Sequence, residues 1–214
     1  MAETFHEGEA RLGTLEFMSG RHPGIGASDF TVVEDTGTGQ VVSTLCLLSR
    51  KWRYGDVVIA VDEVATVGTH PDYRGRGLVR EQFDVVHGWS AERGSLVQGL
   101  LGIPWFYRRF GYEPAMEDPC RRVGDAADVP GNGKIDGSWR VRSATEDDID
   151  FIIEAQTRAS SRYLVSAVVD PERLRYAVSL DLRTVRTIAV VESEAGDRVG
   201  YLSHRNCLHG NALE

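Results

Sequence analysis

The pattern of apolar and polar positions in the first half of the chain predicts a β-meander followed by alternating helices and strands. A helix begins near Leu78, and over residues 81–93 its apolar side chains recur at helical spacing. Its predicted core positions are Phe83, Val86 and Trp89. The predicted strands span residues 29–34, 40–52, 57–69 and 95–101, and a second, short helix spans 105–110. This order of elements predicts a layered α/β or α+β domain.

The second half of the chain begins with a change of composition. Residues 124–138 are rich in Gly, Asp and Pro, which is typical of a linker. Beyond it the patterns predict strands at 139–144, 184–192 and 198–204 and helices at 149–158 and 171–179. We therefore expect one unit over residues 1–123, the linker, and a second unit over 139–214.

Composition narrows the class of protein. The 214 residues carry 24 Lys and Arg against 32 Asp and Glu, and the resulting net charge of −8 argues against a nucleic-acid partner. The apolar runs are only as long as strands, so no membrane association is predicted. The three cysteines are scattered, and no spacing typical of metal ligands occurs, so no metal is expected. Together these features favour a cytoplasmic enzyme.

Two segments concentrate the candidate chemistry. In Val67–Val79 a strand leads through a loop at Pro71 into a glycine-rich turn that opens a helix. Backbone N–H groups of such a turn, with the helix N-terminus behind them, can cradle a pyrophosphate. The alternative is an ordinary strand-to-helix turn with solvated arginines. The second segment is the aromatic run Gly102–Tyr112, about thirty residues further on.

Together these two segments resemble the acetyl-CoA-dependent N-acetyltransferases of the GNAT superfamily. The family's pyrophosphate loop, Q/R-x-x-G-x-G/A, is matched by Arg74 and Gly77, while Val79 replaces its final small residue. The later motif, roughly F-Y-x-x-x-G-F/Y, is matched by Phe106, Tyr107, Gly111 and Tyr112. In having a larger apolar residue at position 79, the chain resembles the Eis-like branch of the family, whose members join two GNAT units in tandem.

The resemblance implies a GNAT fold, in which a mixed central sheet splays at an acetyl-CoA cleft between the strands 57–69 and 95–101. Backbone N–H groups at Val67 and Thr69 would then contact the pantetheine and polarise the thioester carbonyl. Gly68 would either allow a β-bulge or pack closely against a neighbour. The implied acetyl-CoA contacts are Val67, Gly68, Thr69, Arg74, Gly75, Arg76, Gly77, Leu78, Val79, Gly102 and Ile103.

The resemblance also implies two catalytic residues. Tyr107 would be the general acid that protonates the departing thiolate, and the alternative is that it only wedges its helix into the core. Glu63 would be the base that deprotonates the amine, and the alternatives are a solvated glutamate or one paired with an arginine. Members of the Eis-like branch instead use the carboxylate at the end of the full-length chain, a role that Glu214 is not expected to fill.

The predicted function is therefore transfer of an acetyl group from acetyl-CoA to a primary amine. A cationic small molecule or a lysine-like amine is the expected acceptor, and homo-oligomerisation stays open. The alternative is a non-catalytic acyl-CoA-binding sensor or scaffold, because a fold does not fix a function.

The order of elements also suggests a piece of a longer tandem protein. No convincing opening strand and first helix precede Asp29, whereas strand, two helices and a strand pair after residue 138 resemble the beginning of a second GNAT unit. The alternative is that these later elements complete the first unit in a permuted arrangement.

Overall fold

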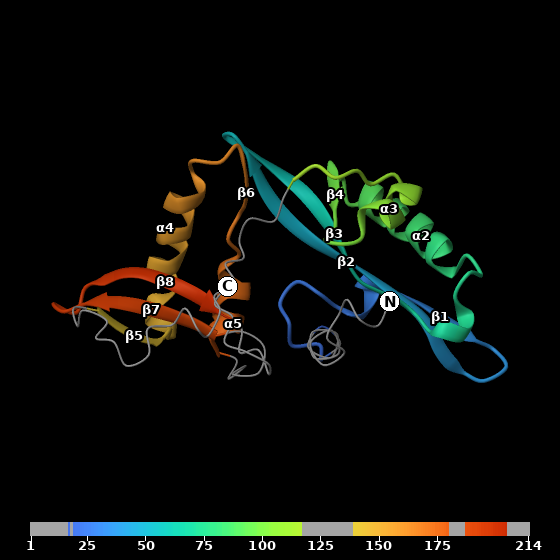
Figure 1. The fold of residues 1–214 in the computed structure, drawn as a ribbon, viewed down its shortest axis with the longest axis horizontal. Coiled ribbons are helices and arrows are strands. Elements are labelled where there is room, and N and C mark those ends of the chain that lie inside the picture. Colours follow the sequence, from blue (N-terminus) through green and yellow to red (C-terminus); the bar gives the residue numbers. More distant parts are fainter. Residues whose placement is uncertain (1–16, 18, 117–138, 180–186, 205–214) are drawn as a thin grey trace. The chain divides into compact units, whose positions relative to one another are not determined.

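The computed structural model describes residues 17, 19–116, 139–179 and 187–204. Contacts divide the chain into two compact units, one formed by Met1–Met116 with Tyr163–Val168 and the other by Glu117–Arg162 with Val169–Glu214. The fold is a mixed α/β arrangement of sheets and helices, as predicted (Figure 1). Each unit is described by itself below.

The first unit is built on a sheet with the order β1-β2-β3-β4. Strands β1 (Phe30–Asp35), β2 (Gln40–Tyr54) and β3 (Val57–Thr69) form the antiparallel meander that the sequence predicts. Strand β4 (Val97–Gly99) then adds in parallel to β3, so the sheet is mixed. Two short 3-10 helices, η1 (Ala27–Asp29) and η2 (Pro71–Tyr73), precede β1 and follow β3.

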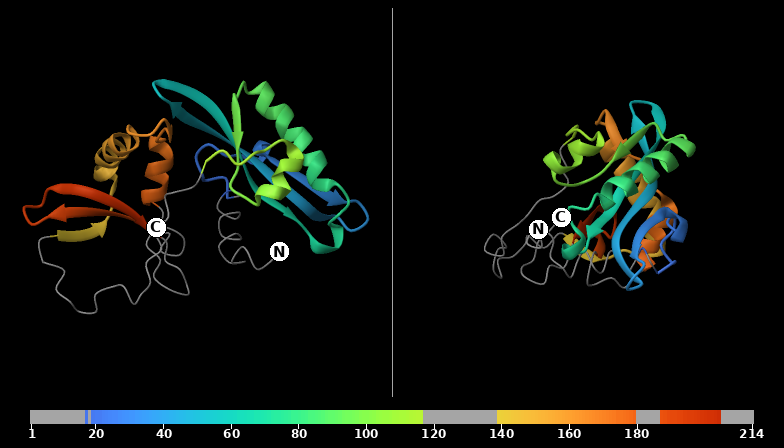
Figure 2. Two further views of the ribbon diagram at one scale, coloured as in Figure 1. Left: turned by 45° about the horizontal axis from the view of Figure 1, so that its top comes forward. Right: turned by 90° about the vertical axis from the view of Figure 1, so that its right-hand side faces the viewer.

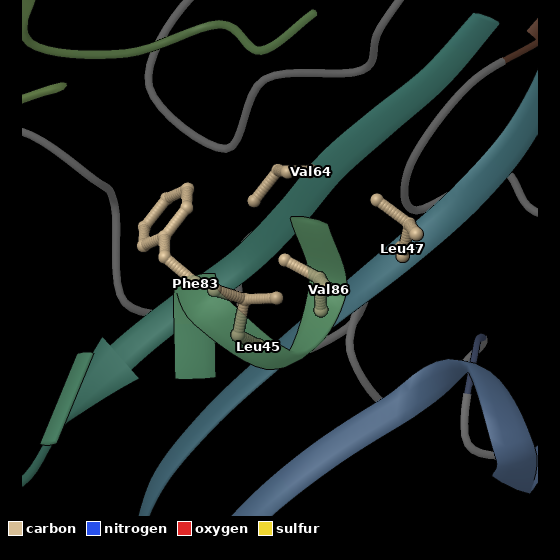
Figure 3. Close-up of a cluster of buried hydrophobic side chains, with 5 residues drawn as sticks. All are labelled: Leu45, Leu47, Val64, Phe83 and Val86. Atoms are coloured by element: carbon tan, nitrogen blue, oxygen red, sulfur yellow. The ribbon is translucent and has the colours of Figure 1, made fainter. Parts of the chain in front are cut away.

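Helix α2 (Leu78–Glu92) covers one face of this sheet (Figures 1 and 2). Its apolar stripe packs on the strands in a buried cluster of Leu45, Leu47, Val64, Phe83 and Val86, shown in Figure 3. Burial of a side chain of this size contributes about 1.5–3 kcal/mol, so this cluster fixes α2 against the sheet. Short helices α3 (Pro104–Tyr107) and η3 (Arg108–Phe110) add aromatic rings to the same cluster.

The opposite face of the sheet carries a second, smaller core. Ile25, Cys46 and Leu48 are buried there, and Phe17, Phe30 and Ala65 pack against them. Because Cys46 lies between two α2-facing leucines on β2, the strand shows the strict alternation expected of a sheet covered on both faces.

A strand that the sequence analysis did not predict completes the first unit. Strand β6 (Val165–Ala167) pairs antiparallel with the end of β2. Backbone hydrogen bonds from Gly55 N to Leu164 O (2.8 Å) and from Val168 N to Lys51 O (2.9 Å) bracket it. Three residues are too few for an alternating pattern to be visible in the sequence, which is why the strand was missed.

The second unit has a three-stranded antiparallel sheet with the order β5-β7-β8, formed by β5 (Trp139–Ser143), β7 (Thr187–Ser193) and β8 (Arg198–His204). The 3-10 turn η5 (Glu146–Asp148) leads into α4 (Ile149–Ser160), and α5 (Pro171–Ser179) follows. Both helices pack on this sheet (Figure 2). The predicted start of β7 at residue 184 lies outside the described residues.

An ion-pair network holds the start of α4 to its sheet. The buried carboxylate of Asp148 accepts two hydrogen bonds from Arg142, at 2.7 and 2.9 Å, and a third from the backbone N–H of Thr145. Hydrogen bonds from Arg142 hold the pKa of the Asp148 carboxyl well below its ordinary value. Arg142 also pairs with Glu192 of β7 at 2.6 Å, so one side chain ties η5 to two strands.

Candidate functional site

Strands β3 and β4 part soon after they meet. Their pairing covers only Val61 with Val97, Asp62 with Gln98, and Glu63 with Gly99. Strand β3 then continues to Thr69, whereas the chain after Gly99 turns toward α3. In the described part of the chain, no strand pairs with residues 64–69 of β3 on that side. An extended ligand could therefore add its own hydrogen bonds to this edge, as a further strand would.

A β-bulge lies in the part of β3 that borders this opening. Thr44 pairs with Gly68 and Cys46 with Ala65, so two residues of β3, Thr66 and Val67, oppose the single residue between them on β2. Thr66 has a φ of 51°, which is uncommon for a β-branched residue, and its hydroxyl donates to the Cys46 sulfur at 3.2 Å. Strained backbone of this kind is concentrated at functional sites.

The bulge corrects one prediction made from the sequence and changes which face of the sheet two residues occupy. It lies at Thr66 and Val67 and not at Gly68, where a Cβ would meet only Thr44 Cγ2, at 4.0 Å, so neither a bulge nor close packing explains that glycine. The bulge also shifts the alternation of β3, so Glu63 and Val67, although four residues apart, lie on opposite faces. Val67 packs with the core under α2, whereas Glu63 lies on the opposite face with Ala65.

The glycine-rich turn has the geometry that its sequence predicts. Gly75 and Gly77 have φ values of 76° and 82°, and a Cβ at either would meet nothing within 4 Å. Gly77 is the N-cap of α2 and makes no side-chain capping bond, so the positive end of the helix dipole faces the turn. These features suit an anion.

Two arginines of the turn are braced by backbone oxygens. Arg74 Nε donates to Thr69 O at 3.2 Å, and Arg76 Nη2 donates to Asp72 O at 3.0 Å. Arg76 also lies over the ring of Tyr73, 4.6 Å from its centroid. The Tyr73 hydroxyl donates to Asp35, which lowers the pKa of that carboxyl and anchors the turn to the β1–β2 hairpin. These contacts hold the two guanidinium groups close to the turn.

Three further residues predicted to contact acetyl-CoA have structural roles at the starts of α2 and α3. Leu78 and Val79 open α2, and the Val79 side chain packs into the core, which explains an apolar residue where the family has a small one. Ile103 O accepts hydrogen bonds from Phe106 N and Tyr107 N, at 3.1 and 3.3 Å. Ile103 therefore positions α3 through its backbone.

Tyr107 is held by a glycine beside it. A Cβ placed on Gly102 would lie 2.2 Å from Cε2 and 2.9 Å from Cδ2 of the Tyr107 ring, so only glycine fits there. The ring also packs with Phe83 and Phe106, and burial raises the pKa of its phenol. Tyr107 therefore does pack into the core, as the alternative interpretation proposed, and it also keeps its proton at neutral pH, as a general acid must.

Glu63 is paired with an arginine. Arg50 Nε donates to its Oε2 at 2.8 Å, and the two side chains are 26% and 39% exposed. This is the arginine pairing that the sequence analysis kept as an alternative. Glu63 lies level with Gly99, at the last paired position before the strands part, on the face opposite α2.

A polar chain under α2 was missed by sequence reasoning. The Tyr112 hydroxyl donates to Gln98 Oε1 and contacts His87 Nε2 at 3.2 Å, beside a hollow of about 290 Å³. His87 is half-buried on α2, and its ring centroid lies 5.6 Å from that of Phe83. Apolar periodicity could not predict the burial of His87, because histidine counts as polar although it continues the buried face of α2.

Two kinds of feature are absent from the described ranges. Residues 17, 19–116, 139–179 and 187–204 hold no group of three His, Cys, Asp or Glu side chains that could bind a metal ion. None of the helices within those ranges combines the length and the apolar character needed to cross a membrane.

Comparison with known proteins shows which family this fold belongs to. Residues 2–115 match the family described as "Acetyltransferase (GNAT) domain". A comparison with curated protein sequences gave no significant match. Among solved structures, Saccharomyces cerevisiae N-myristoyltransferase with bound myristoyl-CoA is similar at a TM-score of 0.61 and 14% identity, over 93% of this chain and 54% of that one.

A second solved structure is a GCN5-related N-acetyltransferase from Kribbella flavida, similar at a TM-score of 0.54 and 21% identity. That match covers 80% of this chain and 41% of the other. This chain thus spans about half the length of the solved structures that it matches. At these identities the similarity shows the fold.

Proposed function

This chain belongs to the GNAT acetyltransferase family, and on that premise we propose that it moves an acetyl group from acetyl-CoA to a primary amine. The observation that carries the proposal is the splay of β3 from β4 beside a bulge and a glycine-rich helix start. One opening thus borders an unpaired strand edge, for the pantetheine, and a turn suited to the pyrophosphate. The proposed contacts are the eleven residues that the resemblance implies.

The reaction needs proton transfers from the nitrogen and to the sulfur. The amine nitrogen attacks the thioester carbon, and the C–S bond breaks as the new C–N bond forms. Glu63 takes the first proton from the substrate ammonium, directly or through one water, which frees the nitrogen lone pair for attack. The second N–H proton passes to solvent as the amide forms. Tyr107 donates its phenolic proton to the departing sulfur and regains one from solvent. Backbone N–H groups at Val67 and Thr69 would stabilise the oxyanion, and a bulge is a means of re-aiming such groups.

The positions of the two groups support these roles. Glu63 marks the last paired position of β3, and Tyr107 packs on Gly102, three residues beyond the end of β4. Their faces differ, since Tyr107 joins the core under α2 and Glu63 lies on the other face. An amine could therefore approach from one face while the thiolate leaves toward the other.

The arginine partner of Glu63 favours a second candidate function. A carboxylate already occupied by Arg50 is what a non-catalytic acyl-CoA-binding module would tolerate. Turnover with any amine would eliminate this candidate.

The second unit supports a tandem arrangement similar to the Eis-like branch. Its order of β5, two helices and the β7–β8 pair is the order in which a GNAT unit begins. We propose that residues 139–214 belong to a second GNAT-like unit, that the protein is cytoplasmic, and that its acceptor is a cationic amine.

Calorimetric titration with acetyl-CoA, followed by a thiol-release assay with a panel of amines, tests the function. Myristoyl-CoA belongs in the same titration, because a similar structure binds it. We expect Tyr107→Phe to lower turnover by about ten- to a thousand-fold with little change in acetyl-CoA affinity. Equal losses of affinity and folding stability would assign Tyr107 to packing, and absence of acyl-CoA binding would refute the proposed function.

A further inference from the structure

Three side chains that differ in chemistry share the sheet face opposite α2. Arg50 and Trp52 follow Leu48 at intervals of two residues along β2, so the three side chains lie on one face. Leu48 belongs to the core of that face. Leu48 pairs with Glu63 of β3, so Glu63 points to the same side. A cation, an indole and a carboxylate thus gather around the point where β3 and β4 part.

The indole of Trp52 extends across β3 to β4. A Cβ built on Gly99 would lie 3.4 Å from Cη2 and 3.7 Å from Cζ2 of the ring. Trp52 itself pairs with Ile59, whereas Gly99 pairs with Glu63, so the ring slants toward the level of Glu63. Val61, which lies between these two positions of β3, is fully buried. The indole therefore forms a wall beside the carboxylate.

The arginine on Glu63 is held loosely enough to be replaced. The hydrogen bond of 2.8 Å joins side chains that are both partly exposed, and exposed pairs of this kind are weak. The guanidinium shows what the carboxylate accepts at this place, namely a cationic N–H donor. A primary ammonium offers the same charge and the same donors on a smaller group.

We propose that Arg50, Trp52 and Glu63 form the acceptor subsite, in which the substrate's ammonium displaces the Arg50 guanidinium from Glu63 and lies against the Trp52 indole. This inference rests on the proposed function and names Arg50 and Trp52 as specificity-determining residues. An indole face attracts a cation, and the neighbouring carboxylate adds charge pairing, so alkylammonium acceptors are selected over neutral ones. Arg50 returns to Glu63 once the amide product, which has no charge, leaves.

The test uses n-butylammonium chloride as the probe and n-butanol as its neutral counterpart of equal length. The protein has four tryptophans, so the Trp52 indole N–H resonance can be assigned with Trp52→Phe and followed by NMR. Titrations are run with and without saturating coenzyme A, which has no acetyl group to transfer to the probe, at matched chloride concentration. We expect a saturable shift of the Trp52 indole with butylammonium and none with butanol.

Two variants separate the roles of the partners. Arg50→Gln removes the competitor, so butylammonium should bind up to about five-fold more tightly, whereas Arg53→Gln, an exposed arginine on the same strand, should leave binding unchanged. Trp52→Leu should weaken binding about two- to five-fold, followed on the Gly99 amide, and Trp139→Leu in the second unit should not.

Weaker binding of butylammonium to Arg50→Gln, or an equal response to butanol, would overturn the proposal. So would a Trp52 indole resonance that does not move at 100 mM probe, a concentration about ten times the dissociation constant of a weak site (on the order of 10 mM). Circular dichroism and thermal unfolding show whether each variant is folded. Calorimetry with acetyl-CoA on the same samples separates failure of the proposed function from failure of the subsite proposal. Loss of acetyl-CoA binding refutes the proposed function, while the titration without coenzyme A still reports on the subsite.

Discussion

At the scale of single residues, the absence of a side chain at one position determines where another side chain lies. The Tyr107 ring occupies the space that a Cβ of Gly102 would need, so the glycine is a condition for the position of the phenol. The aromatic segment Gly102–Tyr112 contains both residues, but its sequence gives no reason for the glycine at its start. The distance of 2.2 Å supplies that reason, since no real contact of a Cβ is so short.

We therefore predict that Gly102→Ala displaces the Tyr107 ring and lowers turnover by a larger factor than it weakens acetyl-CoA binding. Gly88→Ala is the matched control, because Gly88 lies in α2 with nothing within 4 Å of a Cβ. There the alanine should stabilise the helix by about 0.5–1 kcal/mol. Steady-state kinetics and thermal unfolding of both variants provide the measurements. A Gly102→Ala protein with parental turnover would show that Tyr107 has no need of its present position.

A single substitution also tests whether Glu63 is the general base. If Glu63 accepts the amine proton, Glu63→Gln keeps its shape and loses turnover at neutral pH. Part of the turnover should return as the pH rises, because more of the amine is then already deprotonated. The acidic limb that depends on the Glu63 carboxylate should disappear in the variant, leaving only the rise in turnover that follows deprotonation of the amine. Burial raises the pKa of Tyr107, so the acid stays protonated over this range and does not contribute a limb. A parental profile with normal turnover would assign the base to another carboxylate.

At the scale of elements, the turn before α2 combines conformation with charge. Its two glycines both have positive φ, and the space beside each is open, so the structure requires glycine for the backbone and leaves room for a ligand. Arg74 and Arg76 donate to carbonyl oxygens at the end of β3 and in the following loop, respectively. Main-chain N–H groups, more than these side chains, should thus determine affinity.

We predict that Gly77→Val weakens acetyl-CoA binding far more than Arg74→Ala or Arg76→Ala does. Valine at φ 82° is strained even without ligand, so the control must carry the same strain. Gly39→Val meets this requirement, since Gly39 has φ 70° in the β1–β2 hairpin and nothing within 4 Å. Calorimetry should show a loss of affinity in Gly77→Val only. Tight binding by Gly77→Val would place the pyrophosphate elsewhere.

The elements also show how far the sequence could predict the structure. Helix α2 and the meander followed from apolar periodicity, because Phe83, Val86 and the alternating residues of β2 repeat over many positions. The bulge at Thr66 could not be predicted, since one extra residue shifts the register without changing the pattern before or after it. The Arg50–Glu63 pair and the Trp52–Gly99 contact join residues that only strand pairing brings together.

At the scale of the whole molecule, one short segment belongs to a unit far from it in sequence. Residues 163–168 follow α4 of the second unit and yet pair with β2 of the first. The hydrogen bonds at Gly55 and Lys51 bracket the Arg53–Ser166 pair, so the alternation of an antiparallel ladder gives Ser166 a hydrogen-bonded position. The neighbouring Ala167 occupies a position whose N–H points away from β2. These adjacent residues therefore form a matched pair for testing the pairing.

We predict that Ser166→Pro releases the end of β2, whereas Ala167→Pro does not. Proline at 166 removes an N–H of the ladder, and at 167 it removes none. Amide hydrogen exchange should then accelerate at Arg53 and Gly55, whose N–H groups face β6. The amides of Trp52 and Tyr54 face β3 and should keep their protection, which separates loss of β6 from unfolding of the hairpin. Equal exchange in both variants would mean that the segment does not pair with β2 in solution. Because Ala167 is the register partner of Trp52, loss of β6 should also loosen the indole wall, and the Trp52 resonance can be followed in the same samples.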